Sequence, residues 1–90
     1  MEEMYWVENK INITVSIPAL GNKFDCTVPG NMVIREGIAL IIKLVKEEYE
    51  ELECDIEALQ LFHIYKDMFV NKVKTFKDED ICNGSSLVLL

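Results

Sequence analysis

The chain has 90 residues, 50% of them apolar, and its 16 acidic and 9 basic side chains give a formal net charge of −7. This length suffices for one compact domain with one core and leaves no interior for a second domain. A net charge of −7 repels the phosphate backbone of nucleic acids and the surface of an anionic membrane, so we do not expect a nucleic-acid partner.

The sequence also shows no pattern typical of a membrane span, a secretory signal or a reactive cysteine motif. No apolar run approaches the roughly 18 to 20 residues that span a bilayer, so we expect no direct membrane insertion. Residues 1–10 carry acidic side chains where a secretory signal carries basic ones. Three widely spaced cysteines, Cys26, Cys54 and Cys82, do not form a zinc or thioredoxin-like motif. We therefore expect a cytoplasmic protein with reduced thiols, without a metal or a cofactor.

The first predicted elements form a hairpin. The segment from Ile11 to Ile17 alternates apolar with polar residues, which predicts a strand with one buried face. A second alternating run from Phe24 to Val28 follows the pair Gly21-Asn22, whose residues tolerate a positive φ at a turn. We assign residues 1–10 to an N-terminal extension and residues 11–90 to the domain.

A helical period begins after Pro29-Gly30. We expect a helix from about Met32 to about Leu52, with Asn31 as its N-cap. Its apolar residues recur at spacings of three and four, which predicts one stripe facing the sheet. The stripe consists of Ile34, Ile38, Ile41, Ile42, Val45, Tyr49 and Leu52.

Three further apolar residues, Val33, Leu40 and Leu44, lie beside this stripe around Gly37. One hypothesis is a docking groove for a partner helix or a second copy of the chain, with Gly37 allowing close backbone approach; a homodimer dissociated by Leu40→Glu would favour it. The other is that residues 4–6, Met-Tyr-Trp, fold back over this flank. We favour the second because exposed apolar patches on monomers are usually small.

An acidic run follows at the predicted end of the helix. It consists of Glu47, Glu48, Glu50, Glu51, Glu53, Asp55 and Glu57. Acidic side chains at a helix C-terminus oppose the macrodipole, so they do not optimise helix stability. They either assist docking onto a basic surface, for which Glu47, Glu50 and Glu51 are our candidates, or form a solvated surface, as most charge runs do.

The segment from Leu59 to Lys66 predicts a strand whose apolar residues occupy both faces. One face carries Leu61, His63 and Tyr65, and the other carries Phe62 and Ile64. Whichever face turns outward leaves an apolar or aromatic patch suited to protein contact, and we take Phe62 and Ile64 as candidates. His63, the only histidine, has no partner at metal-ligand spacing, so we expect a packed or surface residue.

The rest of the chain completes the predicted sheet. Phe69-Val70 predicts a short edge strand, and Asn83-Gly84 predicts the turn into a final strand. The remaining core candidates are Phe76, Ile81, Leu87 and Leu89. Leaving aside the short edge strand, the order is ββαββ, which is typical of an α+β fold of the β-grasp, ubiquitin-like class, with a mixed sheet packed on one long helix.

Two segments carry a more specific resemblance: residues 24–36, FDCTVPGNMVIRE, and residues 75–87, TFKDEDICNGSSL. Within a match that covers residues 11–90, the chain resembles the YukD/EsaB family of bacterial ubiquitin-like proteins. It departs from the family pattern at Ser85, where an acid is common, and in residues 1–10. The resemblance implies a small cytosolic accessory of the type VII (WXG-motif) secretion system that binds protein at or near a membrane-embedded secretion component, without catalysis.

Two other classes of function are the alternatives. Ubiquitin-like modifiers and sulfur carriers react through a C-terminal Gly-Gly, whereas this chain ends in Leu89-Leu90, so that class requires a tail absent from this chain. An enzyme would need the lone His63 to converge with the scattered cysteines, and no general base is evident. We therefore expect a noncovalent interaction module and no enzymatic activity.

Overall fold

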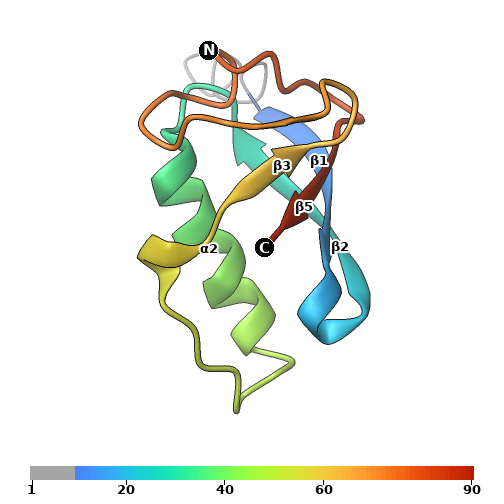
Figure 1. The fold of residues 1–90 in the computed structure, drawn as a ribbon, viewed down its shortest axis with the longest axis vertical. Coiled ribbons are helices and arrows are strands. Elements are labelled where there is room, and N and C mark those ends of the chain that lie inside the picture. The colour runs from blue at the N-terminus through green and yellow to red at the C-terminus, as the bar shows by residue number, and fades with distance from the viewer. Residues whose placement is uncertain (1–9) are drawn as a thin grey trace, which may run out of the picture.

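The computed structural model describes residues 10–90 as a five-stranded mixed sheet with a helix on one face (Figure 1). The elements are β1 (Lys10–Ile17), β2 (Asn22–Pro29), α2 (Ile34–Lys46), β3 (Leu61–His63), β4 (Met68–Phe69) and β5 (Ser86–Leu89), with short 3₁₀ turns η1 (Pro18–Leu20) and η2 (Ile56–Ala58). The strand order is β2-β1-β5-β3-β4, in which β1 and β5 are parallel and the other pairs antiparallel. This arrangement is the predicted β-grasp fold.

The predicted hairpin is confirmed. In β1 the apolar residues Ile13, Val15 and Ile17 are buried, and the strand pairs with β2 along its whole length, from Lys10 opposite Pro29 to Ile17 opposite Asn22. The connection is the η1 turn, which ends at Gly21 with a φ of 64°. β1 begins at Lys10, one residue before the predicted domain boundary, and the proposed fold-back of residues 4–6 lies outside the described residues.

The helix begins later than predicted. Its first residue is Ile34 rather than Met32, and Asn31 is not its cap. The N-cap is Val33, whose side chain makes no capping hydrogen bond. Instead, the N–H of Ile34 donates to the carbonyl of Lys74 at 2.8 Å, and the N–H of Arg35 donates to the carbonyl of Lys72 at 3.0 Å. A segment about forty residues away thus satisfies the exposed amides that a cap normally serves.

The helix also ends earlier, at Lys46 rather than Leu52. Continuing it would place the run of residues 47–53 against the negative end of the helix dipole and set like charges one turn apart. Tyr49 and Leu52, predicted on the helical stripe, instead pack partly buried against the core from the irregular segment that follows.

The core lies between α2 and one face of the sheet. It comprises Ile34, Ile38, Ile41, Ile42 and Val45 from the helix, Ile13, Val15, Val28, Leu61, Leu87 and Leu89 from the strands, and Phe76 and Ile81 from the segment between β4 and β5. The five stripe residues within the helix and the four core candidates after it are thus confirmed as buried. No helix in residues 10–90 has the length and apolar character needed to cross a membrane.

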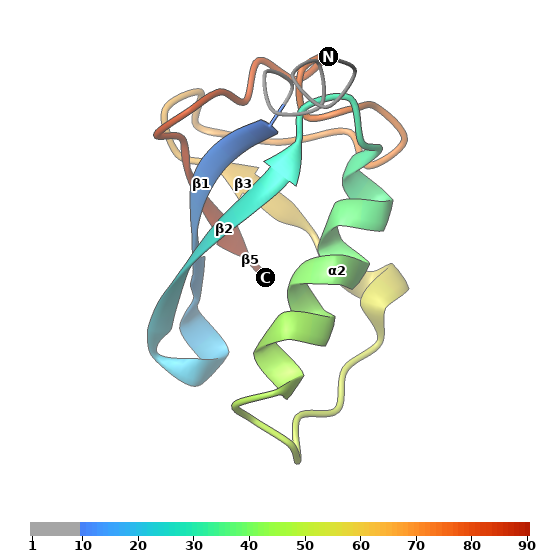
Figure 2. The same cartoon turned by 180° about the vertical axis from the view of Figure 1, so that it is seen from behind.

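Gly37 has a structural role that the sequence did not reveal. Its Cα faces the buried ring of Phe76, and a Cβ at this position would overlap that ring. Figure 2 shows the segment between β4 and β5 passing over the end of the molecule where α2 begins. The ring of Phe76 therefore occupies the space in front of Gly37 that a partner helix would need. This corrects the hypothesis that this glycine admits a partner helix.

The second half of the sheet is shorter than predicted. β3 covers only Leu61–His63, because the chain turns immediately afterwards through Asp67, whose φ is 57°. β4 is Met68–Phe69, one residue earlier than predicted. Val70 leaves the strand and is buried, while its N–H donates to the carbonyl of Leu61 at 2.9 Å.

Candidate protein-interaction surface

The structure settles which side of β3 faces outward. Leu61 and His63 are buried on the side of α2, and Phe62 lies between them on the opposite face. No element within residues 10–90 covers that opposite face, on which α2 does not lie (Figures 1 and 2). We call it the open face of the sheet. Phe62 is therefore on the outward side, which the sequence alone left undecided.

Four apolar residues, Phe62, Ile64, Phe69 and Val88, gather on and beside the open face, and we call them the apolar patch. Phe62 pairs with Phe69 on β4 and with Val88 on β5. The two rings meet edge to face, with centroids 5.1 Å apart. Ile64 and Phe69 are 47% and 50% exposed, so about half of each side chain meets water.

The other half of the open face, on β1 and β2, is polar and internally paired. Thr14 donates to the carboxylate of Asp25 at 3.0 Å, and Thr27 donates to the amide oxygen of Asn12 at 2.7 Å. These cross-strand hydrogen bonds satisfy polar groups on a solvated surface. The half of the open face on β1 and β2 thus has the polar, hydrogen-bonded side chains that are typical of a solvated surface. The half on β3, β4 and β5 carries the apolar patch instead.

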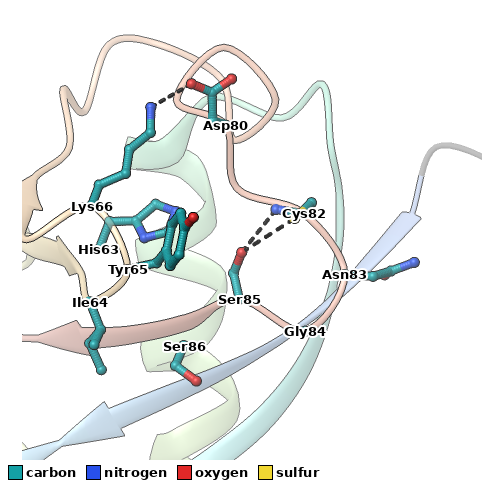
Figure 3. Close-up of a pocket in the computed structure, with 10 residues that line it drawn as sticks. All are labelled: His63, Ile64, Tyr65, Lys66, Asp80, Cys82, Asn83, Gly84, Ser85 and Ser86. Atoms are coloured by element: carbon teal, nitrogen blue, oxygen red, sulfur yellow. Dashed lines mark hydrogen bonds and ion pairs between the residues drawn. The ribbon is translucent and has the colours of Figure 1, made fainter.

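A pocket of about 520 Å³ adjoins the apolar patch at the end of β3 (Figure 3). Residues 63–66 line one side, and Asp80 with residues 82–86 lines the other. His63 is only 2% exposed, and neither of its ring nitrogens has a hydrogen-bond partner among the described residues. We call this site the His63 pocket. Its buried imidazole is a polar group that is expensive to leave unpaired.

Charged and polar groups stand at the mouth of the His63 pocket. The ammonium of Lys66 donates to Oδ2 of Asp80. This hydrogen bond and the charge of Lys66 hold the pKa of Asp80 below the ordinary value of an aspartate. On the far side, the hydroxyl of Ser85 accepts from the backbone N–H of Cys82 at 3.0 Å. That bond fixes the turn that carries the wall of the pocket.

The cysteines and potential metal ligands do not form a reactive centre in the described chain. Within residues 10–90, no three His, Cys, Asp or Glu side chains are placed to hold a metal ion. All three thiols are free, with Cys26 buried and Cys54 and Cys82 exposed. Burial, and secondarily the charge of Asp25, raises the pKa of the Cys26 thiol, which makes it less reactive.

The structure does not bring the predicted interaction residues together. Leu44, on the flank of α2, is 47% exposed, while Val33 and Leu40 are partly buried. The backbone of Val33 bridges to Thr75, so the chain itself covers part of this flank.

The acidic candidates lie in a different part of the molecule from the apolar patch and the flank of α2. Glu47, Glu50 and Glu51 are exposed in the segment after α2. Figure 1 places that segment at the opposite end of the molecule from the loops between β4 and β5. A partner that contacted both the acidic run and the His63 pocket would have to extend along the whole domain.

Sequence reasoning missed several members of the surface. Phe69 was predicted only as part of an edge strand, and Val88 was not singled out. Val88 had a usable signal, since it lies between two core residues, Leu87 and Leu89, and must face the other way in a strand. The pairing of Lys66 with Asp80 had no local signal.

Comparison with known proteins agrees with the fold. No family model and no curated protein sequence matches the chain. A ubiquitin-like domain from an Arabidopsis thaliana protein superposes with a TM-score of 0.70 at 17% identity, covering 91% of this chain and 77% of that one. The ubiquitin of Caldiarchaeum subterraneum gives a TM-score of 0.67 at 15% identity, covering 89% and 90% of the two chains. At such identities the likeness shows a ubiquitin-like β-grasp fold and nothing finer.

Proposed function

We propose that this ubiquitin-like domain is a noncovalent protein-interaction module that binds its partner through the apolar patch. The observation that carries the proposal is the pair of edge-to-face phenylalanine rings on a sheet face that no element of residues 10–90 covers. Aromatic side chains are enriched at the centre of protein interfaces, where their burial supplies much of the binding energy.

The contrast within the open face supports this assignment. The polar half shows that this sheet can present a solvated, hydrogen-bonded surface between β1 and β2. The apolar patch departs from that pattern over three neighbouring strands, which concentrates exposed apolar groups in one place. Contiguous exposed apolar surface of this kind marks sites of protein contact.

The partner that we propose is a component of a type VII secretion machinery, on the strength of the YukD/EsaB resemblance. Because the chain carries a net charge of −7, a partner with a basic surface around its contact site would associate faster at low salt. The exposed Glu47, Glu50 and Glu51 would contribute to this attraction without lying in the contact itself. Raising the ionic strength should therefore slow association.

The flank of α2 is the second candidate surface. Leu44 is exposed there to the same fraction as Ile64, 47%. However, the flank offers no aromatic residue, and Phe76 already occupies the approach to Gly37. We therefore rank it below the apolar patch and include it as an arm of the test.

The test is affinity capture from an extract of the source organism, with quantitative mass spectrometry of the retained proteins. The bait is immobilised wild-type protein or one of three charge variants, Ile64→Glu, Leu44→Glu and Thr27→Glu. Each adds one acid to an exposed position, and Thr27 on β2 is the matched control in the polar half of the open face. Backbone amide NMR spectra check that every variant is folded.

We expect a protein retained by the wild type and by Thr27→Glu, and lost with Ile64→Glu. Loss with Leu44→Glu alone would move the binding site to the flank of α2 and contradict the proposed surface. Retention of the same proteins by all four baits would contradict it as well.

A further inference from the structure

We propose that Asn83 is a deamidation site that hydrogen bonds to Asn12 keep closed while β1 and β5 are paired, so that its conversion to isoaspartate marks chains in which this pairing has opened. The proposal does not rest on the apolar patch. Asn83-Gly84 is the only Asn-Gly pair in the chain. Glycine has no side chain to shield its backbone nitrogen, so the asparagine before it is the one most open to attack.

The reaction needs only water. The backbone nitrogen of Gly84 loses its proton and attacks Cγ of Asn83, while the bond from Cγ to Nδ2 breaks and ammonia leaves with that proton. A succinimide ring remains, and water then opens it. Attack of water on Cγ gives aspartate. Attack on the main-chain carbonyl carbon gives isoaspartate, whose main chain runs through Cγ and is longer by one methylene.

The fold occupies both reacting groups. The N–H of Gly84 donates to the backbone carbonyl of Asn12 at 2.8 Å. The N–H of Asn12 donates to Oδ1 of Asn83 at 2.7 Å. The first hydrogen bond has to break before the nitrogen of Gly84 can attack. The second keeps the side-chain carbonyl of Asn83 directed at β1 rather than at Gly84.

The turn that carries the pair is also held in place. The N–H of Ser85 donates to the carbonyl of Cys82 at 3.0 Å, which closes a β-turn around Asn83 and Gly84. Gly84 has a φ of 86°, a conformation that favours glycine at this position of the turn. The hydroxyl of Ser85 also accepts from the N–H of Cys82 at 3.0 Å (Figure 3). The turn therefore resists the rotation that the reaction requires.

Water and base nevertheless have free access to the pair. Asn83 and Gly84 are both exposed, and no atom lies within 4 Å of the position that a Cβ of Gly84 would take. Hydrogen bonds rather than burial therefore protect this site. Directly after the turn, β1 pairs with β5, with Thr14 opposite Ser86. Opening of this pairing releases the turn and allows the reaction.

The first experiment incubates the protein in mildly alkaline buffer, either folded or unfolded in guanidinium chloride. Peptide mapping with electron-transfer fragmentation follows position 83 and distinguishes isoaspartate from aspartate. We expect Asn83 to convert before any other asparagine in the unfolded chain. In the folded protein its conversion should be at least about tenfold slower, because the hydrogen bonds to Asn12 have to open first. Equal rates at position 83 in the two states would overturn the proposal.

Two serine variants test whether the turn sets the rate. Ser85→Ala removes the hydroxyl that fixes the turn. Ser86→Ala is the matched control, because it removes an exposed hydroxyl from the next residue. Relative to its own unfolded rate, folded Ser85→Ala should convert about threefold to tenfold faster than the wild type, and folded Ser86→Ala as slowly as the wild type. An unchanged rate in Ser85→Ala, or equal acceleration in both variants, would contradict the proposal.

The product itself tests the marking role. The longer main chain of isoaspartate moves the turn out of register with Asn12. Asn83→Asp adds the same charge on an ordinary backbone and keeps an oxygen for the N–H of Asn12. We expect the amide NMR signals of Thr14 and Ser86 to move in the isolated isoaspartate form and to stay close to wild type in Asn83→Asp. Wild-type signals in the isoaspartate form, or equal shifts in the two proteins, would contradict the marking role.

Discussion

The two halves of the open face show how differently one sheet can meet water. On β1 and β2, Thr14 and Thr27 face outward and form hydrogen bonds with side chains of the neighbouring strand. On β3, β4 and β5, the equivalent positions carry Phe62, Phe69 and Val88, which have no polar group to offer. The two halves also differ in the length of their strand pairing, since β1 pairs with β2 over eight residues and β3 with β4 over two, but the side-chain chemistry decides how each half meets water. Function is best sought where the surface departs from the polar pattern.

The largest effect that we predict is the loss of stability when a fully buried apolar side chain of α2 is shortened. Ile41 of α2 is 0% exposed, and Ile41→Ala should lower the free energy of unfolding by about 2–5 kcal/mol, since it leaves a cavity in the core. Urea denaturation measures this change. The control, Leu44→Ala on the exposed flank, should cost about 1 kcal/mol or less. Similar losses for both variants would contradict the assigned orientation of the helix.

A second variant tests whether the ring of Phe76 occupies the space in front of Gly37. Helix propensity alone predicts that Gly37→Ala stabilises the protein by about 1 kcal/mol. Because a Cβ would overlap the Phe76 ring, we expect the opposite sign, a destabilisation of about 1–3 kcal/mol. Thermal or urea unfolding distinguishes the two outcomes. A more stable variant would show that the ring yields easily and that Gly37 is not needed for its packing.

The two phenylalanine rings of the apolar patch should be energetically coupled to each other without contributing much to the stability of the fold. In a double-mutant cycle, Phe62→Ala and Phe69→Ala should be coupled by about 0.5–1.5 kcal/mol through their edge-to-face contact. Both single variants should keep the wild-type amide spectrum outside the patch. Additive effects would mean that the rings do not hold each other in place in solution.

The smallest effect concerns the ion pair beside the patch. Asp80 should titrate below an ordinary aspartate because of the hydrogen bond and charge of Lys66, and Lys66→Gln should bring its pKa back up. A carboxyl whose folded-state pKa is depressed stabilises the fold at neutral pH, and this contribution disappears as the pH falls through the folded-state pKa. Carboxyl ¹³C NMR follows the titration. An Asp80 pKa that does not respond to Lys66→Gln would show that the pair does not form.

Much of the fold could be predicted because its signals are local. Alternation in the first strand and the apolar stripe from Ile34 to Val45 are periodicities within one element, and both are present in the structure. The start of the helix could not be predicted in this way, since Asn31 looked like a cap while the backbone carbonyls of Lys72 and Lys74 accept from its first N–H groups. Only the folded chain brings that distant segment to the helix.

The candidate site was predictable only in part for the same reason. Phe62 and Ile64 could be named because a strand with apolar residues on both faces must leave some of them outside. Which face turned outward depended on where α2 packs. Phe69 joined the patch through pairing between strands, and Asp80 reached Lys66 through the loop before β5.

The central claim is tested most directly by photo-crosslinking in cells of the source organism. A photoreactive phenylalanine analogue is placed at position 64 in the apolar patch or at position 27 in the polar half of the same face. The account predicts one discrete crosslinked protein from position 64 and none from position 27. Equal crosslinking at both positions, or a discrete product from position 27 alone, would contradict it.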